Sequence, residues 1–121
     1  MAGEALFVGW GQVVRGREQL ALEVFQETVG FYAKLQEDGQ IDGFEAVLLS
    51  PHGGDLAGFF IIRGELASID AMRASQEFLR VVTRAGSVVD KVGVVTAYTG
   101  EALAQVMGLF GEVSQGLPQA K

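Results

Sequence analysis

Residues 56–62 read Leu-Ala-Gly-Phe-Phe-Ile-Ile, and the rest of the chain is organised around this stretch. Successive side chains of a β-strand point to opposite faces, so Phe59 and Ile61 share one face. Phe60 and Ile62 share the other face, and both faces are therefore apolar. A short run of aromatic and β-branched residues is typical of a central strand that is covered on both sides.

An internal repeat indicates the architecture around this strand. Val13-Val14-Arg15-Gly16 is matched by Ile61-Ile62-Arg63-Gly64, and each segment precedes a stretch of helical periodicity and then another apolar strand. The unit strand–helix–strand therefore occurs twice. Two such units pair as a ferredoxin-like βαββαβ sheet, and right-handed crossovers place both helices on one face.

The expected fold class is α+β, with a four-stranded antiparallel sheet in the order 4-1-3-2 plus a C-terminal helix. The strands are predicted near residues 5–14, 44–50, 56–63 and 91–98. Helices are predicted at 18–38, at 69 to about 86 in two segments, and at 101–114. Ser68 and Ser75 are the predicted N-caps of the two segments, and Gly39 is the predicted left-handed stop of the first helix. The stripe of the second segment is Phe78, Leu79, Val81 and Val82, while Val88-Val89 either continues the helix or begins the return.

Composition bounds the functional classes. The chain has 121 residues, of which 49% are hydrophobic, so it suits one folded domain over 1–121, with an ordered core of about 5–114 and a tail at 115–121. The net charge of -6 argues against binding nucleic acid through its phosphates. No apolar run approaches the roughly 20 residues that span a bilayer, so no membrane partner is expected. The chain has no cysteine, which favours the cytoplasm.

The chain resembles the dimeric α/β-barrel superfamily, and Met72-Arg73-Ala74-Ser75-Gln76-Glu77-Phe78 is similar to the broken second helix of its antibiotic-biosynthesis-monooxygenase-like members. The resemblance implies two ferredoxin-like protomers that oppose the helix-free faces of their sheets. It does not define an activity, because members include cofactor-free monooxygenases, haem-degrading enzymes, isomerases and proteins without an assigned role. No cofactor is expected here.

The apolar strands themselves predict a homodimer joined through the sheet face. Two crossover helices cover one face, and a bare apolar face would exceed the few hundred Å² that soluble monomers usually expose. The alternative is that the C-terminal helix folds over the open face of its own sheet. Its stripe consists of Leu103, Val106, Met107, Phe110 and Val113.

Few residues carry chemistry. His52 is the only histidine, and with no cysteine it excludes a zinc site of ordinary composition. His52 is either a solvated turn residue or a general base at a cavity rim. Glu45 interrupts an apolar strand, so it is either exposed or lines a cavity. His52 and Glu45 are the catalytic candidates.

The ligand-binding candidates are Trp10, Gln12, Arg63 and Tyr98. Tyr32 is a further candidate for a cavity hydrogen bond, although the helical period does not decide whether Phe31 or Tyr32 is buried. Arg63, like Arg15, either pairs with helix carboxylates or binds an anion. Gly9 and Gly11 either make room for a helix or form a cavity floor.

Two functions remain open. The protein is a small-molecule-binding or interaction module, or it is a cofactor-independent enzyme of monooxygenase or isomerase type that acts on a small hydrophobic substrate. The sparse polar residues favour the first.

Overall fold

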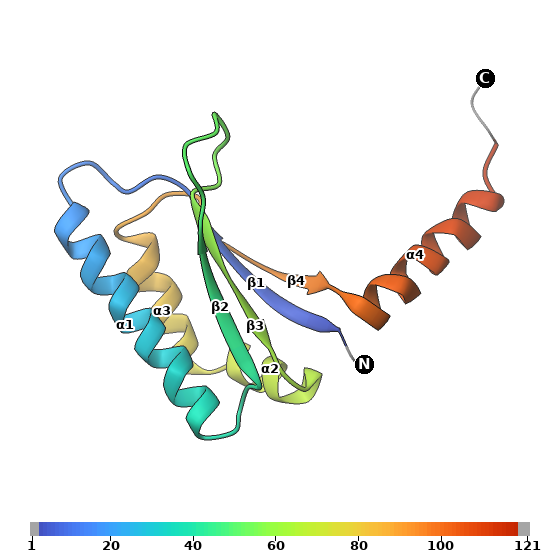
Figure 1. Cartoon of the computed structure of the whole chain (residues 1–121), viewed down its shortest axis with the longest axis horizontal. Coiled ribbons are helices and arrows are strands. Elements are labelled where there is room, and N and C mark those ends of the chain that lie inside the picture. The colour runs from blue at the N-terminus through green and yellow to red at the C-terminus, as the bar shows by residue number, and fades with distance from the viewer. Residues whose placement is uncertain (1–2, 119–121) are drawn as a thin grey trace.

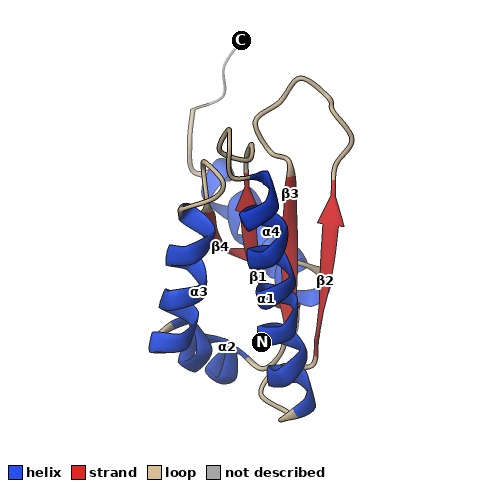
Figure 2. Ribbon diagram, turned by 90° about the vertical axis from the view of Figure 1, so that its left-hand side faces the viewer, coloured by secondary structure: helices blue, strands red, loops and turns tan. Residues whose placement is uncertain are grey.

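The computed structural model describes residues 3–118, and the chain folds around one antiparallel sheet. The elements are β1 (Glu4–Trp10), α1 (Glu18–Glu37), β2 (Gly43–Leu48), β3 (Gly58–Arg63), α2 (Leu66–Arg73), α3 (Gln76–Gly86), β4 (Gly93–Tyr98) and α4 (Gly100–Gln115). The sheet order is β2-β3-β1-β4, and α1 and α3 run side by side on one face (Figures 1 and 2). The predicted ferredoxin-like fold and strand order are confirmed.

The two faces of β3 have different surroundings. On the face toward the helices, Phe60 lies opposite Val8 of β1 and Ala46 of β2, and it is 3% exposed. Ile62 on the same face is completely buried. Phe59 and Ile61 point to the other face and remain only half-buried. We call these the covered face and the open face.

The predicted strand over residues 5–14 is wrong beyond Trp10. Gly11 N–H donates to the carbonyl oxygen of Asp90 over 2.8 Å, and Gln12 N–H donates to Asp90 Oδ1 over 2.6 Å. Val13 then forms an isolated bridge with Val89. Residues 11–14 therefore leave the sheet and pair with the segment that returns from α3.

The other strand ends also differ from the prediction by about two residues. The left-handed φ of 54° at Lys91 interrupts the extended backbone, so β4 begins at Gly93. The hairpin ladder ends where Leu48 faces Gly58, so residues 49–50 and 56–57 belong to the connecting loop.

Two of the three predicted capping residues lie at observed helix ends. Gly39, at φ 77°, ends α1, and Gln40 N–H donates to the Leu35 carbonyl over 2.9 Å, as in a Schellman motif. Ser75 Oγ accepts from Phe78 N–H over 3.1 Å, which confirms this N-cap. Ser68 is not an N-cap, because α2 already begins at Leu66.

The buried residues of α1 are Val24, Thr28 and Tyr32, so Tyr32 rather than Phe31 is the buried member of that pair. In α3 the stripe is narrower than predicted, because Leu79 is 64% exposed. Val88 and Val89 follow the end of α3 and begin the return toward the sheet.

Helix α4 does not cover its own sheet. It leaves the end of β4 and projects away from the fold on the side opposite α1 and α3 (Figure 1). Phe110 is 66% exposed and Met107 is 56% exposed. The alternative of self-coverage is therefore wrong. Gln115 belongs to α4, and residues 119–121 of the predicted tail lie outside the described residues.

Candidate functional site

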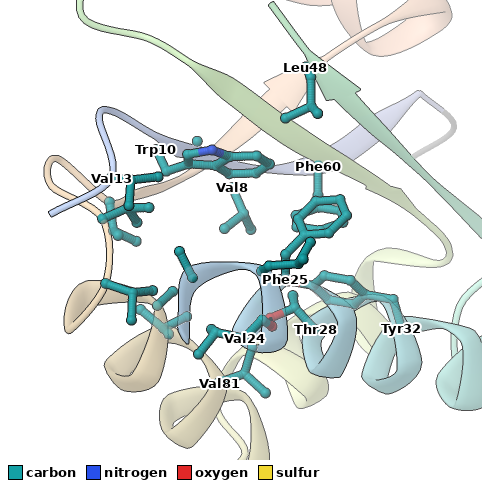
Figure 3. Close-up of a pocket in the computed structure, with 18 of the residues that line it drawn as sticks. Val8, Trp10, Val13, Val24, Phe25, Thr28, Tyr32, Leu48, Phe60 and Val81 are labelled. Atoms are coloured by element: carbon teal, nitrogen blue, oxygen red, sulfur yellow. Dashed lines mark hydrogen bonds between the residues drawn. The ribbon is translucent and has the colours of Figure 1, made fainter. Parts of the chain in front are cut away.

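A cavity of about 350 Å³ lies between the covered face of the sheet and helices α1 and α3 (Figure 3). The strands contribute Val8, Trp10, Leu48 and Phe60, and α1 contributes residues including Val24, Phe25, Thr28 and Tyr32. The opposite wall contains Val81, Val82 and Ala85 of α3, with Val88 and Val89 from the return segment. This volume is at the lower end of the range that is usual for pockets that bind small molecules.

Aromatic rings form one wall of the cavity. The ring of Phe60 lies 5.3 Å from Trp10, 5.6 Å from Phe25 and 5.1 Å from Tyr32, measured between centroids. Offset and tilted contacts at these distances are favourable beyond the area they bury. Phe60, in the stretch that organises the chain, is therefore also the centre of this wall.

Glycines let the aromatic rings lie flat on the sheet. The Trp10 ring packs over Gly58, where a Cβ atom would approach its Cζ2 to 2.6 Å. On the open face, the Phe7 ring covers Gly9, where a Cβ atom would approach Phe7 Cε1 to 2.6 Å. No helix packs over Gly9, which also contributes to the cavity lining. At Gly11 a Cβ atom would collide with the Asp90 side chain, which explains this second glycine.

Polar groups are scarce in the cavity. The Thr28 hydroxyl donates to the Val24 carbonyl over 2.7 Å, and the Glu18 carboxylate accepts from Gly16 N–H over 3.1 Å. These two groups already have partners within the fold. The Tyr32 hydroxyl is buried and has no hydrogen-bond partner among the described residues.

Tyr32 is a neutral hydrogen-bond donor at ordinary pH. Burial raises the pKa of its phenol well above the usual value, because the phenolate would lose its hydration. A buried polar group without a partner costs free energy, about 1–3 kcal/mol. Tyr32 is completely buried, so its side chain supports the cavity wall and a bound molecule would reach the hydroxyl only after neighbouring side chains had moved.

The structure does not bring the two catalytic candidates into the cavity. His52 is exposed in the loop between β2 and β3, where its Nε2 lies 2.8 Å from the Leu56 carbonyl oxygen. Its Nδ1 accepts from Gly54 N–H over 3.2 Å, so the ring holds the loop together. Glu45 is exposed on the open face, opposite Ile61. A catalytic role for either residue stays a prediction.

Of the four ligand-binding candidates, only Trp10 lines the cavity. Gln12 is exposed where the chain leaves β1, and Tyr98 is 45% exposed at the end of β4. Arg63 lines a separate surface groove at the far end of β3, together with Asp42 and other residues. Neither Arg63 nor Arg15 forms an ion pair within residues 3–118.

Several cavity residues carried no chemical signal in the sequence. Phe25, Val81 and Val88 are apolar residues of the kind that fill any core, and only their placement around an unfilled space distinguishes them. Their helical spacing indicates burial but not what lies opposite. Tyr32 was identifiable as a polar residue in an apolar stripe.

Two general features bear on ligands and location. Within residues 3–118 no cluster of three or more His, Cys, Asp or Glu side chains is positioned to hold a metal ion. Among the same residues, no helix combines the length and the hydropathy needed to cross a bilayer.

Comparison with known proteins gives structural likeness alone. No protein-family model matches the sequence, and no curated protein matches it either. A dimeric ferredoxin-like protein of unknown function from Jannaschia sp. CCS1 superposes with a TM-score of 0.62 at 12% identity, over 80% of this chain and 100% of the other. A DABB-family protein with a ferredoxin-like fold from Mesorhizobium loti gives 0.59 at 13% identity, over 81% and 98%.

SnoaB, a cofactor-independent oxygenase from Streptomyces nogalater, gives a TM-score of 0.56 at 21% identity, over 84% of this chain and 98% of the other. These likenesses agree with the ferredoxin-like fold. They span about four-fifths of this chain.

Proposed function

We propose that the protein is a homodimeric binding protein for a small, uncharged, mainly apolar molecule, which occupies the cavity between the sheet and helices α1 and α3. The observation that carries this proposal is the cavity of about 350 Å³, whose lining consists mainly of apolar side chains. Such a site suits a ligand with a hydrophobic body and few polar groups. An anionic ligand would lose its hydration, and the lining has no cationic side chain to replace it. The one carboxylate of the lining, that of Glu18, already accepts from Gly16 N–H.

The homodimer is part of the proposal because the open face needs cover. Its central apolar residues are Phe7, Val47, Phe59, Ile61 and Val95, which we call the open-face patch. Phe7 and Phe59 stack with their centroids 5.2 Å apart, while Val95 is still 53% exposed. A second copy of the chain presents the same apolar patch, so the two patches can pack against each other across a two-fold axis. The dimeric proteins of similar fold support a homodimer.

An enzymatic function has less support. The likeness to a cofactor-independent oxygenase suggests chemistry on a bound apolar substrate. A general base would have to lie within hydrogen-bond reach of that substrate. Among the residues that line the cavity, Tyr32 stays protonated because burial raises its pKa, and the Glu18 carboxylate is already engaged by Gly16 N–H. We therefore favour ligand binding over catalysis.

The absence of cysteine supports the cytoplasm as the place where the protein acts.

The test uses Trp10, the only tryptophan of the chain, as a reporter inside the cavity. Native mass spectrometry of freshly purified protein would first identify any compound that copurifies. Titration with that compound, or with a neutral probe such as naphthol, should then change the Trp10 emission with saturation. Ala21 lines the cavity, so Ala21→Phe should fill it and abolish the change.

Ala33 provides the matched control, because it is exposed on the same helix. Ala33→Phe should leave the titration unaltered. Equal responses from wild type and Ala21→Phe would contradict binding in this cavity. A failure to saturate with any neutral probe, and no copurified compound, would contradict the binding function itself.

A further inference from the structure

Helix α4 carries an apolar face that nothing in the described chain covers. Leu103, Val106, Met107, Phe110 and Val113 follow the helical period along one side, and each is at least 37% exposed. The opposite side carries the polar residues Glu101, Gln105 and Glu112. The helix is therefore amphipathic, which is typical of one that packs against a surface.

The start of α4 is held firmly, so its direction is built into the fold. Thr99 lies between β4 and α4, and both its N–H and its hydroxyl donate to the Gly3 carbonyl over 2.8 Å. Ala102 in the first turn is completely buried. Gly3 and Gly100 have positive φ angles of 94° and 52°, and a Cβ atom on Gly3 would collide with the Thr99 carbonyl.

This fixed start points α4 to the side of the sheet that carries the open-face patch (Figure 1). The patch and helix α4 therefore lie on the same side of the molecule, and the apolar residues of both remain exposed. Val95 in the patch is 53% exposed, and Phe110 in the helix is 66% exposed. A body seated on the patch would have α4 alongside it.

A second copy of the chain is the occupant that fits both surfaces. A half-exposed large side chain presents on the order of 100 Å². Seven such side chains on and after α4, together with the patch, approach the roughly 800 Å² per partner of a stable interface. The seven are Leu103, Val106, Met107, Leu109, Phe110, Val113 and Leu117.

A lipid surface fits less well. Helices that lie on membranes carry lysine and arginine on their polar face, which attracts anionic lipids. The charged residues of α4 are Glu101 and Glu112, and the helix has no basic residue. An anionic bilayer would therefore repel it.

We propose that α4 is an arm that packs on the partner subunit, so that the two copies hold each other through the open-face patch and through both α4 helices. This inference rests on the homodimer proposed above and adds a second contact to it.

The test is photo-crosslinking of the full chain at micromolar concentration, with p-benzoylphenylalanine introduced at Phe110. We expect a covalent product of twice the 12.9 kDa chain mass. The same group introduced at Gln105, on the polar side of α4, should give little of it. As a second measurement, Phe110→Asp should weaken dimerisation at least tenfold in sedimentation equilibrium, and Gln105→Asp should leave it unchanged.

A wild-type dimer that gives no intersubunit product from position 110, and that Phe110→Asp does not weaken, would overturn the arm while leaving the homodimer intact. A wild-type chain that sediments as a monomer would instead overturn the homodimer. Cosedimentation with phosphatidylserine vesicles that Phe110→Asp abolishes would overturn the arm in favour of a membrane contact.

Discussion

The two faces of the sheet are made from similar side chains and end in different environments. Phe60 and Phe59 are neighbours in β3, yet Phe60 is buried under α1 and Phe59 remains half-exposed. The difference arises from chain connectivity, because both crossover helices fall on one side. The hydrophobic side chains therefore indicate that a sheet face must be buried. The topology decides whether helices of the same chain bury that face.

The largest effect should come from truncating the covered face. Phe60→Ala removes the ring that contacts Trp10, Phe25 and Tyr32, and it should lower the free energy of unfolding by about 3–5 kcal/mol. Phe59→Ala is the counterpart on the open face. It should cost less in unfolding and should weaken dimerisation instead.

Urea denaturation measures the first effect, and sedimentation equilibrium measures the second. If Phe60→Ala and Phe59→Ala lowered the free energy of unfolding equally, and Phe59→Ala left dimerisation unchanged, the proposed difference between the two faces would be wrong. This result would mean that the open face is no more an interface than the covered one.

A smaller effect, of opposite sign, should come from Tyr32→Phe. The change removes a buried hydroxyl without a partner, so at pH 7 the unliganded protein should gain up to about 1–3 kcal/mol. A protein destabilised by the change would show that the hydroxyl has a partner in solution.

The same residue gives a pH dependence. Because burial raises the pKa of Tyr32 in the folded state, the unfolded chain loses this proton first, near pH 10. Stability is therefore fully present below that pH and falls as the pH rises through it. Tyr32→Phe should remove this part of the alkaline loss in urea titrations. Tyr98→Phe, at an exposed tyrosine, should not.

The smallest predicted change in stability concerns the N-terminal cap of α3, one of the helices that pack on the covered face. Ser75→Ala removes the hydroxyl that caps α3 and should cost about 1 kcal/mol in thermal or urea unfolding. Ser68→Ala, inside α2, should change stability by less than about 0.5 kcal/mol. The reverse order would contradict the observed helix starts.

Local patterns in the sequence were sufficient for the order of the elements. The repeated strand–helix–strand unit predicted the sheet order, and Gly39 and Ser75 predicted helix ends, because these depend on residues within a few positions. The end of β1 at Trp10 was not predictable, because Asp90 from far along the chain captures Gly11 and Gln12.

The site was harder to predict for the same reason. Trp10 and Tyr32 were candidates because of their side-chain chemistry, and both line the cavity. His52 was a candidate on chemistry too, but its hydrogen bonds with Leu56 and Gly54 keep it in its loop. The direction of α4 depends on Thr99 meeting Gly3 from the other end of the chain, and no local pattern reports such a contact.

Sedimentation equilibrium of the wild-type chain at micromolar concentration tests the central claim most directly, which is that a second copy covers the open face. We predict a single species at twice the 12.9 kDa chain mass, and a folded monomer for Ile61→Asp in the open-face patch. Far-UV circular dichroism of the variant checks that it remains folded. A wild-type species at 12.9 kDa would contradict the claim.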